Sequence, residues 1–348
     1  MGRMLVIEKQ KQIGYLEYEE PVLKSNEVRL EMLYSGISAG TQLTLYRGTN
    51  SMVDKHFDQD LRIYLDRIAG DTEHPSLYPA AGCWGYEEVG KVSETGSEVS
   101  KVKPGDIVYA QCGHRSTAVF TEDYAEKNLL PDGLEPKVGV FAQIGAIALN
   151  AILDADIHVG ENVAVFGQGV PGQIITQLAK LNGATVFAVD MDESRLAMSK
   201  KLGADFTLNP NNCDAALEIK KMTGRGVDKS IEISGFSDAL HEAIRATIYN
   251  GIVVCAGFIV GPATKLCLGD EFHINRITVI SSQIEDVNRS VSNAWNFIRK
   301  QQTIMKLAQS GKLDLISLIS NIIPFNKAAE AYHLLDTSRE CMQVILEF

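Results

Sequence analysis

The sequence predicts an α/β protein with a β-rich first part followed by a parallel sheet that carries helices on both faces. Residues 1–145 contain short apolar runs separated by Gly, Pro, Asn and Asp, which is typical of an irregular β-rich domain. From residue 146 to 288, apolar runs alternate with helical periodicity, as in a parallel sheet. With 348 residues, the chain is about twice a typical domain length, so we expect two domains.

The composition is ordinary for a globular protein but acidic. Charged residues make up 22% and hydrophobic residues 45%, and the formal net charge is −11. Lys and Arg form no cluster, so we expect no nucleic-acid partner, because backbone binding needs a concentrated positive face. The cysteines form no C-x-x-C pair and are expected to be buried, reduced thiols. They are Cys83, Cys112, Cys213, Cys255, Cys267 and Cys341.

No segment is predicted to address or anchor the chain to a membrane. The apolar stretch Met4–Ile7 is followed at once by Glu8 and Lys9, so it does not form the apolar core of a signal peptide. We identify no apolar run that approaches the roughly 20 residues of a membrane span. The expectation is a cytoplasmic protein without a membrane partner.

In the β-rich part, three runs are predicted as strands: Val28–Leu33, Glu88–Val92 and Asp106–Ala110. The segment Asp54–Ile68 differs, because its apolar side chains fall at helical spacing (Phe57, Leu61, Leu65 and Ile68). We therefore expect an amphipathic helix inserted in a loop there. With its flanks up to His74, it is expected to form one wall of a substrate cleft.

In the second part, strands and helices alternate. The predicted strands are Val163–Phe166, Thr185–Val189, Phe206–Leu208, Lys229–Ile233, Ile252–Ala256 and Thr278–Ser281. The predicted helices are Ala146–Ala155, Gly172–Leu181, Glu193–Leu202, Ala215–Met222 and Ala239–Ala246. Two helices around Trp295–Gln309 and Lys327–Leu335, then a strand at Gln343–Leu346, close the chain.

The turn after the first of these strands carries the pattern G-x-G-x-x-G. Gly167 suits a tight turn, Gly169 lets the backbone approach a pyrophosphate, and Gly172 allows close helix–strand packing. The N-terminus of the following helix then offers free N–H groups and a positive dipole to the phosphates. Pro171 suits the first helical turn, where its missing donor costs little.

The next strand ends in Asp190, 18 residues after Gly172. A carboxylate there accepts hydrogen bonds from both ribose hydroxyls and repels a 2′-phosphate, so NAD is favoured over NADP. Arg195 either contacts the adenosine or is a solvated helix residue. Val170, Pro171 and Ser234 complete the residues expected to bind the cofactor.

With this turn in place, the whole chain resembles the medium-chain dehydrogenase/reductase superfamily of zinc-type alcohol dehydrogenase-like proteins. The resemblance rests on motifs at Tyr34–Thr41, Gly85–Gly90, Lys103–Val108 and Ile323–Tyr332. Its S-G-I-S-A-G-T and G-Y-x-x-V-G segments look closest to bacteriochlorophyllide-dehydrogenase-like proteins. The resemblance implies a GroES-like catalytic domain, residues 1–145 and 289–348, interrupted by a Rossmann domain, residues 146–288, with the active site in the cleft between them.

The resemblance fails at the metal sites. The positions of the family's Cys, His and Glu or Cys zinc ligands fall on Ser38, Tyr86 and Gln143, and its four-cysteine lobe is absent. An alcohol, a phenol and an amide are poor substitutes for the N, O⁻ or S⁻ ligands of zinc. We therefore expect no metal. By analogy with the family, a homodimer is expected to pair along the edge strand Ile277–Ile284.

Without a metal, other groups must stabilise the developing oxyanion charge and manage the proton. The resemblance places Tyr86 as a donor to the substrate oxygen, with Ser38 and Thr41 as its hydrogen-bond partners and Gln143 at the third ligand position. Glu87 is expected to support these groups. His114, in a loop of the first domain, would suit a proton relay through a near-neutral pKa. Alternatively, Tyr86 is a packed aromatic and His114 a structural histidine.

The leading hypothesis is NAD-dependent, zinc-independent interconversion of a secondary alcohol and a ketone on a small-molecule polyol, sugar or cyclitol. Reduction of an activated C=C bond, as in quinone and enoyl reductases, is an alternative, although those enzymes usually use NADPH. A third hypothesis is a non-catalytic relative that binds nucleotide.

Overall fold

A computed structural model describes residues 1–68, 70, 73–82 and 84–348. The chain forms two compact units. Unit 1 comprises residues 1–130, 135–140 and 320–348, and unit 2 comprises residues 131–134 and 141–319. The described cysteines are all free thiols, of which Cys267 is exposed, contrary to the expected burial. Cys83 lies outside the described residues.

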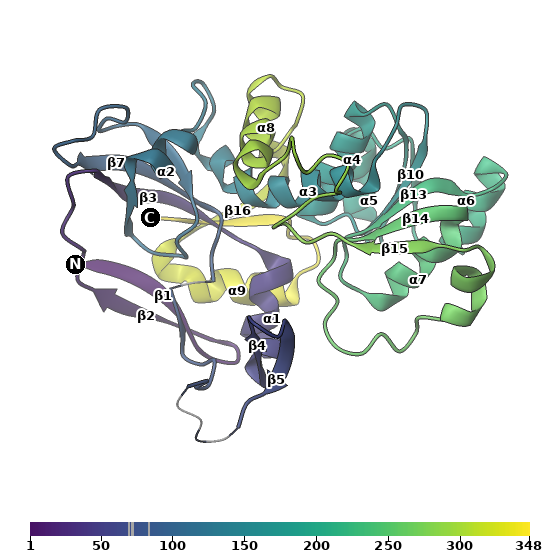
Figure 1. Cartoon of the computed structure of the whole chain (residues 1–348), viewed down its shortest axis with the longest axis horizontal. Helices are drawn as coiled ribbons and strands as arrows, with labels where there is room; N and C mark the ends of the chain where they lie inside the picture. Colours follow the sequence, from purple (N-terminus) through teal and green to yellow (C-terminus); the bar gives the residue numbers. More distant parts are fainter. Residues whose placement is uncertain (69, 71–72, 83) are drawn as a thin grey trace. The chain divides into compact units, whose positions relative to one another are not determined.

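Unit 1 is the predicted β-rich body (Figure 1). Its largest sheet has the order β16-β17-β3-β7-β8, with β9 also paired to β3. These strands span Ile319–Pro324 (β16), Gln343–Glu347 (β17), Glu27–Ile37 (β3), Glu88–Thr95 (β7), Ile107–Ala110 (β8) and Thr117–Thr121 (β9). A second sheet, β2-β1-β6, contains Gln12–Tyr18 (β2), Gly2–Lys9 (β1) and Ala80–Ala81 (β6).

Strand β3 shows why the main sheet has one buried face in its first half. Val28, Leu30 and Met32 are buried and alternate with more exposed residues, which is the pattern of a sheet that covers a core on one side. The α-helices among the described residues of this unit are α1 (Ala39–Arg47), α2 (Glu122–Lys127) and α9 (Ala328–Thr337). Helices α1 and α9 pack together, with the rings of Tyr46 and Tyr332 5.4 Å apart.

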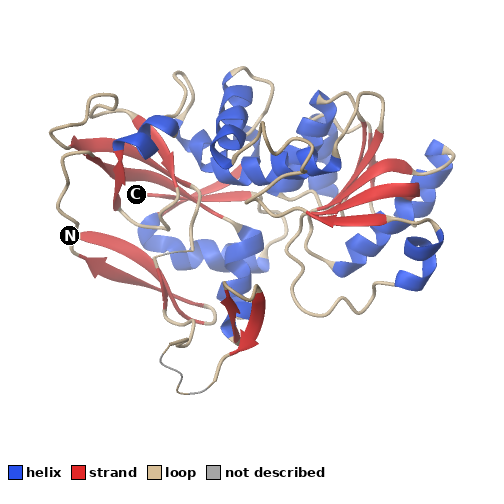
Figure 2. Ribbon diagram, viewed as in Figure 1, coloured by secondary structure: helices blue, strands red, loops and turns tan. Residues whose placement is uncertain are grey.

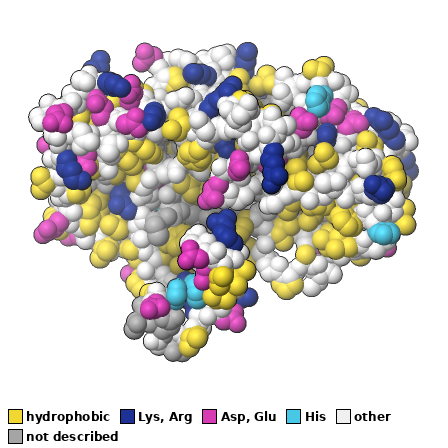
Figure 3. Space-filling model, viewed as in Figure 1, with side chains coloured by type: hydrophobic (Ala, Val, Ile, Leu, Met, Phe, Trp, Pro, Cys, Tyr) yellow, Lys and Arg dark blue, Asp and Glu magenta, His cyan; other side chains and the backbone are white. Residues whose placement is uncertain are grey.

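The predicted helix at Asp54–Ile68 is wrong, because this segment is a β-hairpin of β4 (Lys55–Asp58) and β5 (Ile63–Asp66). The side chain of Asp58 accepts hydrogen bonds from the backbone of residues 60 and 61, and Arg62 has a φ of +57°. Both features form a turn that a helix does not allow. Apolar side chains gather on the hairpin (Figure 3), and Ile63 and Tyr64 are exposed there. The flank towards His74 lies partly outside the described residues.

Unit 2 contains the predicted parallel sheet with helices on both faces (Figure 2). The strand order is β12-β11-β10-β13-β14-β15, and every neighbouring pair is parallel. The strands span Phe206–Leu208 (β12), Thr185–Val189 (β11), Asn162–Phe166 (β10), Val227–Glu232 (β13), Thr247–Cys255 (β14) and Thr278–Ser281 (β15). Almost all of β10 and β11 is buried, as expected for strands covered on both faces.

The helices of unit 2 are α3 (Phe141–Ala155), α4 (Val170–Leu181), α5 (Glu193–Lys201), α6 (Ala215–Thr223), α7 (Ser237–Ala246) and α8 (Phe297–Gln309). Although the sequence assigned residues 289–348 to the first domain, α8 belongs to unit 2. It packs on α3, where Gly145 gives it room: a Cβ there would lie 2.6 Å from Ile304. The first unit resumes only at Ser320.

One apolar run was overlooked in the sequence. Residues Pro136–Ala155 are long and apolar enough to cross a membrane by length and composition, with a mean hydropathy of 1.7. However, 89% of the apolar 18-residue window within this segment is buried inside the protein, which is typical of a core helix. The expectation that no run approaches that length is therefore wrong, although burial explains the apolar composition.

Candidate functional site

The glycine turn lies between β10 and α4, at the carboxyl end of the parallel sheet. Gly167 has a φ of +98°, a conformation that favours glycine, and a Cβ on Gly172 would lie only 1.9 Å from the carbonyl oxygen of Gly167. Both residues must therefore be glycine for the turn to close. Such a turn, at the point where the strand order reverses, is where open α/β sheets bind nucleotides.

Gly169 and the start of α4 leave space for an anion. A Cβ on Gly169 would meet nothing within 4 Å, so this glycine is not required by packing. Gly169 is the N-cap, it makes no side-chain cap, and Val170 and Pro171 form the first helical positions. The N–H groups and positive dipole of this end therefore fit a pyrophosphate, as the sequence predicts.

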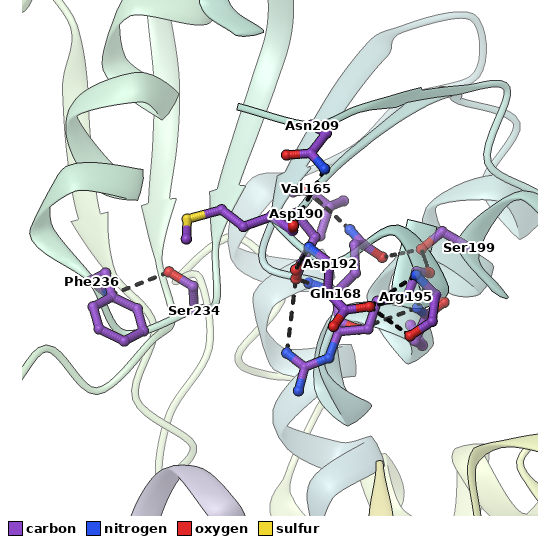
Figure 4. Close-up of polar contacts among 12 residues, drawn as sticks. Val165, Gln168, Asp190, Asp192, Arg195, Ser199, Asn209, Ser234 and Phe236 are labelled. Atoms are coloured by element: carbon purple, nitrogen blue, oxygen red, sulfur yellow. Dashed lines mark hydrogen bonds and ion pairs between the residues drawn. The ribbon is translucent and has the colours of Figure 1, made fainter. Parts of the chain in front are cut away.

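Asp190 follows β11 beside this turn (Figure 4). Its carboxylate accepts hydrogen bonds from the backbone N–H of Gln168 at 2.6 Å and of Asp192 at 2.9 Å. The guanidinium of Arg195 lies 4.0 Å away. Asp190 is thus held in a fixed orientation at the sheet edge, where a carboxylate can accept from ribose hydroxyls. Gly167, Gly169, Asp190 and the helix end together fit a dinucleotide.

Two buried amides that sequence reasoning missed hold the turn in place. Gln168 donates to the carbonyl oxygen of Val165, and its Oε1 accepts from the hydroxyls of Thr176 and Ser199 at 3.0 and 2.9 Å. Gln173 donates to the carbonyl oxygens of Gln168 and Arg195. The only sequence signal was the unusual pair of glutamines around the glycines.

Ser234 follows the neighbouring strand β13 and is hydrogen-bonded to Phe236 (Figure 4). A Cβ on Gly167 would lie 2.8 Å from the Ser234 backbone nitrogen. Buried Glu232 accepts hydrogen bonds from the Ser234 N–H and hydroxyl and from the Gly235 N–H, at 2.6, 2.5 and 2.9 Å. Glu232, which sequence reasoning missed, therefore fixes the segment that faces the glycine turn.

In unit 1, the structure brings together three of the candidate catalytic residues. The hydroxyl of Tyr86 is hydrogen-bonded to the hydroxyl of Ser38 and lies 3.1 Å from that of Thr41. Ser38 is the N-cap of α1 and Thr41 lies in its first turn, while Tyr86 precedes β7. Tyr86 and Thr41 remain partly exposed. We call Tyr86, Ser38 and Thr41 the hydroxyl cluster.

Burial, with the nearby charge of Glu87, raises the pKa of Tyr86 to about 12. The phenol is therefore protonated at neutral pH and is a hydrogen-bond donor. Glu87 itself is fully buried, and its Oε2 accepts from Gln343 at 2.9 Å. Burial, reinforced by Glu88, raises its pKa to about 8. Gly36 provides the space for Glu87, since a Cβ there would lie 2.3 Å from the carboxyl oxygen.

His114 lies apart from the hydroxyl cluster, in a second polar network that is buried. Its Nδ1 is 2.6 Å from the Ser35 hydroxyl, which lies 3.0 Å from Glu88, and its Nε2 is 2.7 Å from Oε1 of Gln42. Burial lowers the pKa of His114 to about 4, so the near-neutral value expected from the sequence is wrong. Tyr332 also joins this network. Sequence reasoning missed Gln42 and Tyr332, because nothing local marks them.

The donor set does not fit a catalytic zinc. Ser38 and Tyr86, which the sequence resemblance assigns to two zinc-ligand positions, bond to each other through neutral hydroxyls. Gln143 is buried in α3 of unit 2, with its Oε1 3.3 Å from Nε2 of Gln301. Among the residues that the structure describes, no three His, Cys, Asp or Glu side chains come together as a metal-binding group. Neutral alcohols, phenols and amides are weak ligands for zinc.

Comparison with known proteins gives the family. The model of the family described as "Zinc-binding dehydrogenase" matches residues 171–300. D-guloside 3-dehydrogenase from Escherichia coli (strain K12) is 30% identical over 323 residues, which cover 91% of each chain. (R,R)-butanediol dehydrogenase from Bacillus subtilis (strain 168) is 28% identical over 305 residues, covering 80% of this chain and 82% of that protein.

The solved structures share the fold. L-idonate 5-dehydrogenase from Escherichia coli K-12 superposes with a TM-score of 0.76, covering 100% of this chain and 98% of that one, at 18% identity. This likeness concerns the fold alone, whereas the sequence match to the D-guloside enzyme extends over nearly the whole chain. The chain belongs to the medium-chain dehydrogenase/reductase superfamily, among the zinc-type alcohol dehydrogenase-like proteins.

Proposed function

We propose that this protein is an NAD-dependent dehydrogenase that interconverts a secondary alcohol and a ketone on a polyol, sugar or cyclitol, without zinc. The observation that carries the proposal is the hydroxyl cluster, which holds a protonated phenol beside two hydroxyl groups. The sequence resemblance assigns Ser38 and Tyr86 to two zinc-ligand positions of the family. Relatives that act on a guloside and on a butanediol support the substrate class.

In this proposal, residues of unit 2 bind the coenzyme, and residues of unit 1 donate a hydrogen bond to the substrate oxygen. The backbone around Gly169 and the N-terminus of α4 hold the pyrophosphate, and Asp190 accepts from the adenosine ribose hydroxyls. A negative charge at Asp190 repels the 2′-phosphate of NADP, which favours NAD. When bound, the nicotinamide ring accepts or gives the hydride.

Tyr86 then takes the role that a metal plays in the zinc enzymes. Its hydroxyl donates to the ketone oxygen and stabilises the charge that develops there as the alkoxide forms. Ser38 and Thr41 orient the phenol, and transfer of the phenol proton to the alkoxide completes the alcohol. The phenolate that remains takes a proton from the solvent. In the oxidation direction the alcohol proton passes to the Tyr86 phenolate, so oxidation is expected to become faster as pH rises towards the pKa of Tyr86, about 12.

The test begins with binding and continues with turnover. Calorimetric titration with NAD and NADP should show tighter binding of NAD. Alditols, inositols and D-gulosides are then offered with NAD, and enones with NADH, while the nicotinamide absorbance is recorded. Oxidation of a hydroxylated substrate supports the proposal. Reduction of enones alone would favour the C=C reductase, and tight binding without any turnover would favour a non-catalytic role.

We also propose that the protein is a homodimer paired along β15, the edge strand of the parallel sheet. The unpaired backbone groups of an edge strand offer hydrogen bonds to a second copy. Light scattering of the wild type and of a variant with proline at Thr278 tests this: the variant should be monomeric, and a dimeric variant would contradict the pairing.

A further inference from the structure

Gln42 is a buried polar side chain of α1 that the proposed reaction does not use. Gln42 is fully buried, with an exposed fraction of 0%. Its Oε1 accepts from the hydroxyl of Tyr332 at 2.5 Å and lies 2.7 Å from Nε2 of His114. Its Nε2 has no hydrogen-bond partner among the described residues. The amide oxygen alone therefore ties α1 to α9 and to the segment that follows β8.

The direction of these hydrogen bonds follows from what each atom can do. An amide oxygen only accepts, so Nε2 of His114 carries a proton and donates to Gln42. Because burial keeps His114 neutral, its Nδ1 accepts the proton of the Ser35 hydroxyl, 2.6 Å away. The Ser35 hydroxyl also lies 3.0 Å from Oε1 of Glu88.

The same turn of α1 carries the partners of Tyr86. The backbone N–H of Gln42 donates to the carbonyl oxygen of Ser38 at 2.8 Å. Thr41 directly precedes Gln42, and adjacent helix positions project in different directions. Gln42 thus points into the core while Thr41 points towards the Tyr86 hydroxyl, 3.1 Å away. Fixing Gln42 fixes the turn that presents Ser38 and Thr41.

We propose that Gln42 is a positioning residue, which acts through Tyr332 and His114 to hold the first turn of α1 so that the hydroxyl cluster keeps its geometry. For its effect on catalysis this inference rests on the proposed function. The positioning itself does not, because it concerns the environment of the Tyr86 phenol in the protein alone.

The direct test measures the NMR signal of the Tyr86 ring in the protein alone, without substrate or turnover. The tyrosines are labelled with ¹³C at Cζ, and the Tyr86 signal is assigned by its absence in Tyr86→Phe. Gln42→Leu removes the acceptor oxygen, and Tyr332→Phe removes one donor but keeps the ring. Gln42→Glu keeps an acceptor oxygen. Leu45→Ala is the matched control, since Leu45 is also buried on α1 but belongs to the apolar core.

We expect Gln42→Leu and Tyr332→Phe to shift the Tyr86 signal, and Gln42→Glu to keep it close to that of the wild type. Leu45→Ala should lower the melting temperature without moving the signal. The inference is overturned if folded Gln42→Leu leaves the Tyr86 signal unmoved, or if Leu45→Ala moves it as much. Should Gln42→Leu fail to fold, Tyr332→Phe decides by the same criterion.

The kinetic arm separates positioning from binding. Because small displacements of reacting groups cost rate, kcat of Gln42→Leu should fall on the order of 10- to 100-fold, while KM for NAD stays within about twofold. Gln42→Glu should recover most of kcat. An unchanged kcat, or an equal loss in both variants, would contradict the inference. If the wild type itself oxidises no substrate, the proposed function fails while the ¹³C comparison still decides this one.

Discussion

Asp190 of unit 2 and the acidic pair Glu87 and Glu88 of unit 1 lie in opposite surroundings. Asp190 lies at the carboxyl end of the parallel sheet, where its carboxylate accepts hydrogen bonds from two backbone N–H groups. In unit 1, Glu87 and Glu88 are fully buried, and burial raises their pKa values to about 8 and about 7. The nucleotide site thus surrounds its carboxylate with N–H donors, whereas burial around the hydroxyl cluster favours neutral forms of the nearby acids.

This difference suits the two tasks. A dinucleotide offers phosphates and hydroxyls, which backbone N–H groups and one carboxylate can recognise. A ketone oxygen is stabilised best by a hydrogen-bond donor that is not already bonded to water or to a neighbouring anion. In unit 1, the phenol of Tyr86 and the imidazole of His114 are both neutral at pH 7. Each prediction below alters one side of this comparison.

The largest effect is expected at Tyr86. Tyr86→Phe removes the donor to the substrate oxygen, so kcat should fall on the order of 10² to 10³-fold with little change in NAD binding. Tyr18→Phe is the matched control, because its hydroxyl also makes a 2.6 Å hydrogen bond in unit 1, but to a backbone carbonyl. Steady-state kinetics compare the two. Equal kcat in Tyr86→Phe and the wild type would remove Tyr86 from the mechanism.

Two substitutions in the glycine turn should affect protein stability and NAD binding to different extents. Gly172→Ala places a Cβ 1.9 Å from the Gly167 oxygen, so it should destabilise unit 2 by about 1–3 kcal/mol and abolish NAD binding. Gly169→Ala meets open space and should keep the wild-type melting temperature. Its methyl group nevertheless stands where the pyrophosphate approaches, so NAD affinity should fall. Calorimetric titration measures the NAD affinity, and thermal melts measure the stability. Normal NAD binding by both variants would place the nucleotide elsewhere.

Asp190 should set the coenzyme preference. Asp190→Ser removes a charged acceptor of ribose hydroxyls, which is worth about 1.5–3 kcal/mol or about 10- to 100-fold in NAD affinity. It also releases Arg195, 4.0 Å away, to meet a 2′-phosphate, so NADP should bind more tightly.

Asp192→Ser provides the control for that change. Asp192 caps α5 by accepting from the backbone of Ser194 and Arg195, and serine is an equally good N-cap residue, so this variant should change neither stability nor coenzyme choice by much. If both variants shift the NAD to NADP ratio equally, the preference does not arise from Asp190.

The smallest effect concerns stability and pH. Burial raises the pKa of Glu87 from 4.5 to about 8 and that of Glu88 to about 7, so between those limits the folded state binds more protons than the unfolded state. Their contribution is therefore greatest below pH 4.5 and is lost as pH rises to 8. His114 acts in the opposite direction, between about 4 and 6.5. From pH 6.5 to 8 the two acids dominate over His114, and the free energy of unfolding should fall by about 2 kcal/mol.

Denaturant unfolding at pH 6.5 and pH 8 measures this slope. Glu87→Gln keeps an acceptor for Gln343 but cannot ionise, so it should reduce the slope. Glu17→Gln, at an exposed acid of β2, should leave it unchanged. A slope in Glu87→Gln as steep as in the wild type would show that the buried acids do not cause it.

Unit 2 was the easier part to predict from sequence. Its strands are short, nearly continuous apolar runs such as Val163–Phe166, and its helices have a clear amphipathic period, so local pattern and buried face agree. The glycine turn could also be predicted from sequence, because the roles of Gly167, Gly172 and Asp190 follow from the local backbone geometry. The buried amides Gln168 and Gln173 escaped notice there, since their partners come from several elements. Buried Glu232 was also missed.

Unit 1 was harder, for two physical reasons. Helical spacing in Asp54–Ile68 coincided with residues that suit a hairpin, and the turn at Asp58 and Arg62 decided between them. The surroundings of His114 come from segments near residues 35, 42 and 332, so no local pattern showed that it is buried and neutral. The motifs identified Tyr86 and Ser38 as candidates and as hydrogen-bond partners, and the structure contains that hydrogen bond.

The central claim is that a protonated phenol, and not zinc, acts on the substrate oxygen. The most direct measurement is elemental analysis of the purified protein together with NAD-linked turnover before and after exhaustive chelation. The account predicts less than stoichiometric zinc and the same kcat in both samples, with the activity lost in Tyr86→Phe. Stoichiometric zinc, with turnover that chelation abolishes and added zinc restores, would contradict it.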